Sequence, residues 1–415
     1  MTPTQMPTFE PYPLERLFAE SPSAAQWHDW RWQERAALTT VANLEHAFPG
    51  LSETERKQLR AASIGLRFKI TPHMLSLMSV DDKLAPATND PIWSQFVPTF
   101  AESGRAIQSF EENWELPDEM VNSITQHKYR NRLNLRIQNR CLGYCMYCFE
   151  AKRVLDTQSD KDGFTTDYFE EALNYLLAHP EIEEVVISGG EPLILSNDTL
   201  ANLLGRLRRV PQIKAIRIQT RALTHNPYRL DTELVDILKR FDVTAMAFHV
   251  THPVELNDEV KRILDSFGER GCRTMLLSHT PLLKGINDSV ETLTTLFMRL
   301  FTLKIKPYYL LHAMPYTLGS QRFRTRVRRG VELLREIKRH FSNPAVPEYV
   351  IVHAKGKHTV PMELEGTSEF QYRHGVVRFR NWKGEWCEYL DASEEDGHFW
   401  DTPSSHQEAN HAVSH

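Results

Sequence analysis

Residues 140–148 read Arg-Cys-Leu-Gly-Tyr-Cys-Met-Tyr-Cys, which places Cys141, Cys145 and Cys148 within eight residues of one another. The stretch follows a short β-rich run, Leu133–Ile137, and therefore predicts a loop at the carboxyl end of a strand. Cysteine thiolates bind iron–sulfur clusters, and a complete four-iron cubane needs four ligands. Three cysteines without a partner motif leave one iron open, and an open iron can bind a cofactor.

Zinc is the alternative metal for this triplet, because cysteine thiolates also bind zinc. A structural zinc site needs a fourth ligand at comparable spacing, and none follows Cys148. The remaining cysteines, Cys272 and Cys387, stand alone and are expected to be buried bystanders. Five cysteines in 415 residues, three of them clustered, favour a metal site in a reducing compartment over a disulfide framework.

A second motif lies at the end of the next expected strand. Residues 185–193 read Val-Val-Ile-Ser-Gly-Gly-Glu-Pro-Leu, so Gly189 and Gly190 stand at a turn where a backbone can approach a ligand closely. Glu191 can accept a hydrogen bond from an ammonium group. A Gly-Gly turn alone is more often only a turn. Its position one βα unit after the cysteines nevertheless indicates a shared ligand site, because active sites form where barrel strands end.

Short β-rich runs alternate with helical patterns from residue 132 onward. The expected strands are Leu133–Ile137, Glu184–Ile187, Lys214–Ile218, Val243–Phe248, Thr274–Leu277 and Lys306–Leu310. The expected helices are Tyr168–Ala178, Asp198–Arg208, Asp231–Arg240, Asp258–Arg270, Val290–Phe301 and Arg326–His340. Repeated βα units predict an α/β fold with a parallel sheet, either a partial barrel or a doubly wound sheet.

The chain divides into four expected regions. Residues 1–127 form a helical N-terminal region, with helices at Ala24–Thr39 and Ser52–Ala62, the second beginning with a capping box. Residues 128–345 carry the βα units. Residues 346–392 form a small C-terminal β unit with strand-like runs, of which Val350–Val352 is the first, that closes over the site. Residues 393–415 are polar and predicted to be disordered. The tail histidines are His398, His406, His411 and His415, for which a metal role is a minority interpretation.

The composition argues for a small-molecule enzyme of the cytoplasm. The 54 acidic and 49 basic residues are well interspersed and give a formal charge of −5, which argues against binding to nucleic acid or to a membrane surface. No basic leader with an apolar run opens the sequence, and no stretch reaches membrane-spanning length. We therefore expect a cytoplasmic protein.

Together the two motifs strongly resemble the radical S-adenosylmethionine (SAM) superfamily, which has an aromatic residue, here Tyr147, before the third cysteine. The resemblance implies a partial (β/α)6 barrel and a 4Fe-4S cluster whose open iron is chelated by SAM. An electron from the cluster then releases methionine and a 5′-deoxyadenosyl radical. By the same resemblance, Glu191 contacts the amino group of SAM, and Arg221, His249 and His252 are further SAM contacts.

From about Trp27 to Asp391 the chain is similar to the lysine 2,3-aminomutase group. The matching stretches are Trp27–Gln33, Ile70–His73, Lys128–Arg132, Leu282–Asp288, Lys306–Tyr309 and Thr359–Met362. That group uses pyridoxal phosphate (PLP) as well as SAM and moves an amino group between adjacent carbons. The C-terminal cysteine cluster that binds zinc in the clostridial-type enzymes is absent here.

The resemblance also implies a PLP site. Lys357 matches the Schiff-base lysine, although the loop before it is shortened, and Lys355 is a rival two residues away on the same side of an expected extended strand. Lys128 and Arg132 stand at phosphate-binding positions, and Tyr129 stands at the position that stacks on the ring. A lysine in a surface turn and a basic stretch before a strand are otherwise ordinary solvated faces.

Three positions depart from the lysine aminomutases. Two aspartates that bind the distant ammonium of lysine are replaced by Met314 and His353, so lysine is not the expected substrate. The arginine that binds the substrate carboxylate is replaced by Glu150. Either Lys152, Arg153 or Lys355 takes the carboxylate, or the substrate has no carboxylate at that point. The substrate contacts expected from these comparisons are Glu150, Met314, His353 and Lys355.

Two enzymatic functions remain open on this evidence. The preferred one is a PLP- and SAM-dependent 2,3-aminomutase acting on an amino acid other than lysine, and the alternative is a PLP-free radical SAM enzyme that abstracts hydrogen in an oxidation, epimerisation or fragmentation. A non-enzymatic electron carrier or sensor would leave the Gly-Gly-Glu-Pro motif without purpose. The expected partners are an amino acid or derivative, an electron donor such as flavodoxin or ferredoxin, and further copies of the chain in a homo-oligomer.

Overall fold

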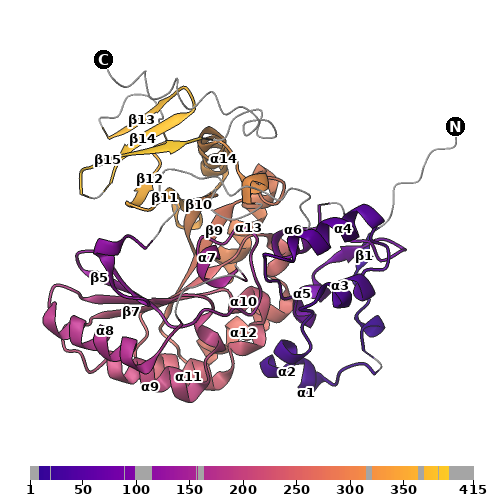
Figure 1. Ribbon diagram of the computed structural model, residues 1–415, viewed down its shortest axis with the longest axis horizontal. Helices are drawn as coiled ribbons and strands as arrows, with labels where there is room; N and C mark the ends of the chain where they lie inside the picture. The colour runs from indigo at the N-terminus through magenta and orange to yellow at the C-terminus, as the bar shows by residue number, and fades with distance from the viewer. Residues whose placement is uncertain are drawn as a thin grey trace.

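The computed structural model describes residues 9–18, 20–87, 89–98, 115–155, 157, 163–314, 320–362, 369–381 and 383–391. These residues form an N-terminal helical region, a large central sheet with covering helices, and a small C-terminal sheet (Figure 1). The expected tail from residue 393, with its histidines, lies outside the described residues. Within the described part of the chain, no helix is long and apolar enough to cross a membrane.

A single sheet organises the molecule. In the described ranges it has ten strands, and their spatial order from β3 to β12 is the order of the sequence. The strands are β3 (Met120–Asn122), β4 (Thr125–Tyr129), β5 (Arg132–Arg136), β6 (Glu184–Ser188), β7 (Ala215–Thr220), β8 (Ala245–His249), β9 (Met275–Leu282), β10 (Lys306–His312), β11 (Glu348–His353) and β12 (Gly356–Thr359). Strands β5 to β11 pair in parallel, and antiparallel partners extend the sheet at both edges.

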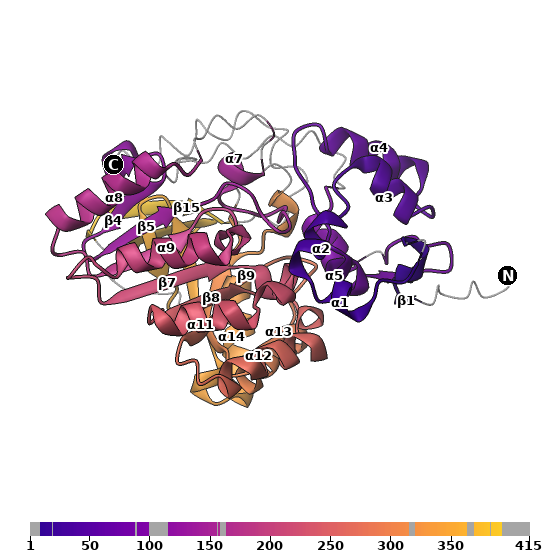
Figure 2. The same cartoon turned by 90° about the horizontal axis from the view of Figure 1, so that it is seen from below.

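Helices follow the parallel strands and cover the outer face of the sheet. Figures 1 and 2 show α8, α9, α11 and α12 side by side along that face. The helices of this part are α7 (Ala151–Val154), α8 (Thr166–Ala178), α9 (Asn197–Leu207), α10 (Ala222–His225), α11 (Thr232–Arg240), α12 (Asp258–Glu269), α13 (Val290–Thr302) and α14 (Val327–His340). Short 3-10 turns lie at η2 (Pro117–Glu119), η3 (Pro192–Ile194), η4 (Pro227–Arg229), η5 (Pro253–Glu255), η6 (Ser320–Phe323) and η7 (Asn343–Ala345). The apolar faces of the α-helices pack against the strands, and together they form one hydrophobic core.

The α/β class with a mostly parallel sheet is as the sequence predicted. One strand has a different partner, because β11 pairs in parallel with β10, with Leu310 opposite Tyr349, whereas Val350–Val352 was placed in a separate C-terminal unit. The sheet also begins at Met120, before the expected boundary at residue 128. A buried strand such as β11 is apolar on both faces, and that pattern does not encode which neighbour it pairs with.

The N-terminal region consists of short helices and a two-stranded sheet. Its elements are β1 (Glu10–Pro11), η1 (Leu14–Arg16), α1 (Ala24–Trp27), α2 (Trp30–Arg35), α3 (Val41–Ala47), α4 (Glu53–Ala62), α5 (Pro72–Ser76), β2 (Ser79–Val80) and α6 (Pro91–Phe96). The capping box at Ser52 and Glu55 is present. The single helix expected over Ala24–Thr39 is instead two helices, because the Asp29 carboxylate caps the Arg31 N–H and starts a new helix there.

This region packs against the loop that carries the cysteines. Tyr144 and Met146 belong to the same apolar cluster as the N-terminal Phe48 and Phe96, and all three cysteines of the triplet pack on that cluster. The N-terminal region therefore forms one wall around the cysteine loop, on the side of the molecule opposite the small C-terminal sheet (Figure 1).

The C-terminal sheet lies over the other end of the central sheet. Its strands are β13 (Phe370–Arg373), β14 (Val376–Arg380) and β15 (Trp386–Leu390). Arg324 donates to the Leu390 carbonyl oxygen at 2.7 Å, and the Asn381 amide donates to the carbonyl oxygen of Lys355 at 3.2 Å. These contacts place the small sheet behind the turn between β11 and β12.

Candidate active site

All three cysteines of the triplet line one cavity of about 90 Å³ at the carboxyl ends of β5 and β6. Their loop is held from the N-terminal side, where the Met146 N–H donates to the Gln95 carbonyl oxygen at 2.8 Å and the Lys69 ammonium donates to the Cys141 carbonyl oxygen at 3.2 Å. Burial raises the pKa of each thiol, so a cationic metal is needed to favour the thiolates.

The donor set fits a cluster with an open iron. Among the described residues, no three His, Cys, Asp or Glu side chains lie close enough to hold a single metal ion. A cubane does not require that closeness, because each thiolate binds a different iron. Cys141, Cys145 and Cys148 would thus hold three irons, with the fourth facing the remaining cavity.

Gly189 and Gly190 also line this cavity, but a side chain at either position would collide with the protein backbone. Gly189 has φ 115°, and a Cβ there would lie 2.5 Å from the Gln138 carbonyl oxygen. A Cβ on Gly190 would collide with the Arg140 carbonyl group. We expected the glycines to admit a ligand. In the structure they allow the turn after β6 to approach the strand-to-loop segment that leads to Cys141.

Glu191 is buried beside the cavity and is bonded to the protein. Its Oε1 accepts from the Thr220 hydroxyl at 2.6 Å and from the Leu193 N–H at 3.0 Å, and its Oε2 accepts from the Arg221 N–H at 2.8 Å. Burial raises the pKa of Glu191. The carboxylate therefore joins the ends of β6 and β7 in addition to facing the cavity, which is where the SAM amino group was expected.

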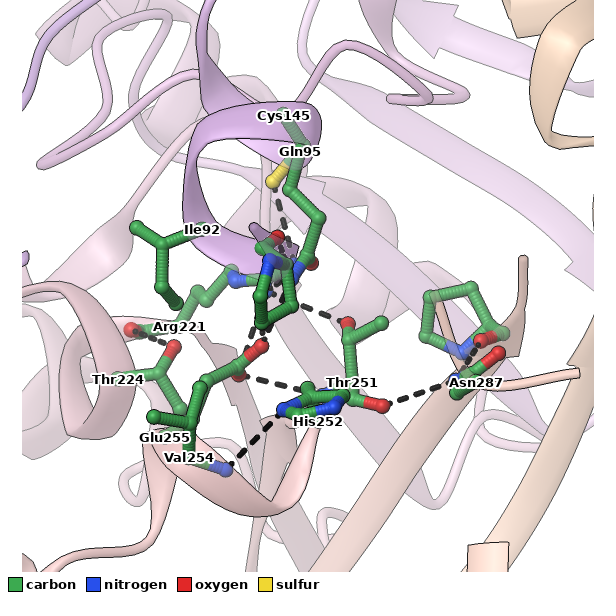
Figure 3. Close-up of polar contacts among 12 residues, drawn as sticks. Ile92, Gln95, Cys145, Arg221, Thr224, Thr251, His252, Val254, Glu255 and Asn287 are labelled. Carbon is green, nitrogen blue, oxygen red and sulfur yellow. Dashed lines mark hydrogen bonds and ion pairs between the residues drawn. The ribbon is translucent and has the colours of Figure 1, made fainter. Parts of the chain in front are cut away.

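Arg221 is the centre of a buried polar network that reaches a cysteine (Figure 3). Its guanidinium donates to Cys145 Sγ at 3.3 Å and to Gln95 Oε1 at 2.9 Å, and it also contacts the Tyr147 hydroxyl. Glu255 is fully buried and pairs with the same guanidinium at 3.3 Å. Arg221 lines the cavity as expected, and its nearest partners are the protein groups around Cys145.

The two histidines expected to contact SAM lie in different places. His249 ends β8 and lines both cavities of the site, and burial lowers its pKa to about 3, which keeps the ring neutral. His252 instead begins η5, where its Nδ1 accepts from the Val254 N–H at 3.2 Å (Figure 3). It is absent from the walls of both cavities as far as the described residues define them. The sequence predicted both histidines just after the expected strand Val243–Phe248, but it did not show in which direction each side chain points.

A second cavity of about 240 Å³ opens directly beside the first. Cys145, Cys148 and Arg221 line it, and so do Lys357 and Tyr129. The cavity brings together residues that are more than 200 positions apart in the sequence, because strands from both ends of the sheet end around it.

Lys357 lies on β12 with its amine 5.2 Å from the centre of the Tyr309 ring. Its backbone N–H donates to the Tyr129 hydroxyl at 3.0 Å. Lys357 is exposed to the cavity that it lines, and the surrounding protein desolvates its amine. This desolvation, together with the nearby Arg217 and Arg132, lowers its pKa to about 7. Lys355 lies in the two-residue turn before β12 and is not among the residues that line the cavity. The two lysines therefore do not share one extended strand as expected.

The other residues expected at a PLP site line the same cavity. Lys128 is paired with Glu119 at 2.6 Å and also donates to the Ala354 carbonyl oxygen. The Arg132 guanidinium lies 4.3 Å from the centre of the Tyr129 ring, so that face of the ring is covered by a cation. Burial lowers the pKa of Lys128 and raises that of Tyr129.

The three residues that differ from the lysine aminomutases, Glu150, Met314 and His353, also line the cavity. Glu150 is buried and accepts from Arg136 Nε at 2.9 Å. Met314 and His353 lie at the ends of β10 and β11, and His353 Nδ1 accepts from the Lys355 N–H at 3.1 Å. Of the described residues that form this cavity, Glu150 is the one that carries a carboxylate.

The sequence did not identify several residues of this cavity. Arg217 on β7 pairs with Glu184 at 2.7 Å and has a buried Nε without a hydrogen-bond partner in the described structure. His279 and His312 line the cavity as neutral rings, because burial lowers the pKa of both. Arg136, at the end of β5, lines it as well. An arginine or histidine near the end of a parallel strand was the available signal, whereas Arg221 and His249 were predicted from the family resemblance.

Comparison with known proteins gives a consistent picture. The radical SAM superfamily model matches residues 135–296. The L-lysine 2,3-aminomutase of Clostridium subterminale is 31% identical over 363 residues, which cover 87% of this chain and 84% of that protein. The L-lysine 2,3-aminomutase of Fusobacterium nucleatum is 31% identical over 360 residues, which cover 86% of this chain and 81% of that protein. The glutamate 2,3-aminomutase of Clostridioides difficile is 26% identical over 360 residues, also covering 86% and 81%.

Proposed function

This chain belongs to the lysine 2,3-aminomutase family of radical SAM enzymes, and on that premise we propose that it is a PLP-dependent 2,3-aminomutase acting on an amino acid other than lysine. One observation carries the proposal. Lys357 lines the same cavity as Cys145 and Cys148, so a lysine-bound cofactor and the cluster would face one enclosed space.

The cluster with SAM would supply a hydrogen-abstracting radical, and PLP would supply an aldehyde and a conjugated ring that stabilises an unpaired electron. The chain's own residues prepare for both. Lys357 has a pKa of about 7, so much of its amine is uncharged near neutral pH and can act as a nucleophile.

The charges of the cavity favour a phosphate at the Lys357 end. Arg132 and Arg217 share one acidic partner, Glu184, at 4.0 and 2.7 Å. This set has one positive charge in excess, and Lys357 adds another when it is protonated. A phosphate of one to two negative charges would balance these cations. Lys128 would bind the phosphate as well only if it gave up its ion pair with Glu119.

The part of the cavity lined by Met314 and His353 does not suit lysine. Met314 is apolar, and the buried His353 ring accepts from a backbone N–H, so neither side chain supplies a carboxylate. A distant ammonium buried there would lose on the order of several kcal/mol of hydration without a carboxylate to replace it. A glutamate 2,3-aminomutase among the relatives indicates that substrates other than lysine occur on this scaffold.

Borohydride trapping tests the proposal directly. Protein expressed with ample vitamin B6 and iron is purified anaerobically, reduced and digested, and the peptides are mapped by mass spectrometry. We expect pyridoxyl on Lys357, its loss in Lys357→Ala and its retention in Lys355→Ala as the matched control. Absence of pyridoxyl from the wild-type protein would contradict the proposal, as would brisk formation of β-lysine from lysine.

A PLP-free radical SAM reaction is the second candidate. The pairing of Lys128 with Glu119 favours it, because one expected phosphate contact is already neutralised. In that case the reduced protein would carry no pyridoxyl group, and Lys357→Ala would leave SAM cleavage with the true substrate unchanged. The same trapping experiment therefore separates the two candidates.

A further inference from the structure

A buried cation lies against one cysteine of the triplet. The Arg221 Nη1 donates to Cys145 Sγ at 3.3 Å and also contacts the Tyr147 hydroxyl. Arg221 directly follows β7, where its backbone N–H donates to Glu191 Oε2 at 2.8 Å, and its side chain is only 8% exposed. Hydrogen bonds at both ends of the residue therefore hold the guanidinium beside the sulfur.

The donors of this guanidinium are directed at protein groups (Figure 3). Nη2 lies among three oxygen acceptors, which are Gln95 Oε1 at 2.9 Å, Thr251 Oγ1 at 3.3 Å and Glu255 Oε1 at 3.3 Å. Nε is buried and has no hydrogen-bond partner in the described structure. The four N–H groups on the terminal nitrogens therefore have protein partners. Arg221 was expected to contact SAM, but this arrangement directs its charge at a cluster ligand.

The carboxylate that pairs with Arg221 balances its charge only in part at the sulfur. Glu255 binds Nη2, whereas Cys145 Sγ lies against Nη1. The charge of Glu255 is also shared with neutral donors, because its oxygens accept from the Gln95 amide at 3.1 Å and from the Thr251 N–H at 3.2 Å. Since the Coulomb energy falls with distance, the guanidinium acts on the sulfur more strongly than the carboxylate on its other nitrogen.

We infer that Arg221 raises the reduction potential of the 4Fe-4S cluster through Cys145, and that Glu255 limits this rise. Reduction transfers one electron from an external donor to the cluster and breaks no bond, so the cluster becomes more negative by one charge. A cation that donates a hydrogen bond to a ligand sulfur stabilises this more negative form. Arg221 is thus a positioning residue that makes the cluster easier to reduce. The inference concerns the cluster alone and holds with or without PLP.

A redox titration of the full-length protein tests the inference. The protein is loaded anaerobically with iron and sulfide and poised at fixed potentials without SAM, and electron paramagnetic resonance measures the reduced cluster. At the wild-type midpoint the reduced and oxidised forms are equal in amount. In Arg221→Met we expect their ratio to fall at least about tenfold, which is a shift of about 59 mV for one electron. In Glu255→Gln the ratio should rise instead, because the guanidinium charge is then unbalanced.

Arg206→Met is the matched control, because it removes the same charge from an exposed pair with Glu170 on the helical face and should leave the ratio unchanged. An unchanged ratio in Glu255→Gln, or a ratio that does not fall in Arg221→Met, would overturn the inference. Weaker SAM binding in equilibrium dialysis together with an unchanged ratio would make Arg221 a SAM contact instead. If Arg221→Met does not fold or load iron, Glu255→Gln still decides, since it retains the guanidinium and differs from the wild type by one charge.

Discussion

The two walls of the large cavity are built differently. The cysteine wall is closed, because Arg221, Glu255, Gln95 and Cys145 bond to one another and a whole N-terminal region packs behind them. The hairpin wall is formed by β11 and the edge strand β12, and there the Lys357 backbone pairs with β11 and donates to the Tyr129 hydroxyl. One wall is fixed by buried charged side chains, and the other by an edge strand that pairs with one neighbour.

This difference follows from what each wall would bind. A cluster needs its thiolates in fixed places, and a buried charge network supplies rigidity at the cost of desolvation. A lysine that exchanges between a cofactor and a free amine needs room to move and a low pKa. Mutation of the cysteine wall should therefore affect the whole protein, whereas mutation of the hairpin wall should affect chemistry with little effect on stability.

The largest effect is expected from the cysteine triplet. Replacement of any one of Cys141, Cys145 or Cys148 with Ala should abolish the iron–sulfur absorption and all SAM cleavage, because each thiolate holds a different iron. Iron content, the visible spectrum and formation of 5′-deoxyadenosine measure the outcome. Cys272→Ala and Cys387→Ala are the controls and should keep the cluster. A triplet variant with full iron content would refute the assignment.

The next effect should come from the buried pair behind Cys145. Arg221→Met leaves Glu255 buried without its cation and should lower the free energy of unfolding by about 3–5 kcal/mol. Urea unfolding of the metal-free protein under reducing conditions measures the change. The double variant Arg221→Met, Glu255→Gln should be less destabilised than the sum of the single variants, since neither charge is then left alone. Additive losses would show that the pair does not act as a unit.

A pH effect is expected at the hairpin wall. The pKa of Lys357 is lowered to about 7, so its amine loses the proton near neutral pH instead of near its ordinary value. The rate at which PLP-free protein reacts with added PLP should therefore rise with a midpoint near pH 7 and level off above about pH 8. Stopped-flow absorbance measures the rate, and Lys357→Ala supplies the background. A rate that keeps rising toward pH 10 would show an ordinary lysine.

The smallest effect should come from the tyrosine that supports the hairpin. Tyr129→Phe removes the acceptor for the Lys357 N–H and should cost about 1 kcal/mol. Hydrogen exchange at the β12 amides should become faster while exchange in β5 stays the same. Tyr175→Phe, which removes a comparable hydroxyl contact to His127 on the helical face, is the control and should not change exchange at β12. If both variants changed exchange at the β12 amides equally, the Tyr129 hydroxyl would not be a specific support of the hairpin.

Much of the fold was predictable because its elements carry strong local patterns. The six expected strands from Leu133 to Leu310 all occur, since each is an apolar run bounded by turn residues and followed by an amphipathic helix. Local patterns did not assign β11 to the central sheet, because pairing depends on residues far away in the sequence. They also did not show that Asp29 would start a new helix within Ala24–Thr39.

The site was predictable where chemistry depends on residue type and spacing. The cysteines and the Gly-Gly-Glu-Pro turn line one cavity because both follow neighbouring parallel strands. Arg136 and Arg217 were missed because an arginine on a strand resembles a solvated residue until its neighbours are known. His252 shows the reverse, since its place in the sequence suggested a ligand contact while its ring caps a turn.

The sheet is ordered as the chain is written, with each strand from β3 to β12 lying next to its predecessor. During synthesis on the ribosome, every new strand can therefore add to an edge that already exists, without waiting for a distant segment. The half of the sheet that presents the cysteines is made while Lys357 has yet to be translated. The metal-binding half of the enzyme thus has its scaffold first, and the strand that bears the reactive amine arrives as one of the last pieces of the nascent chain.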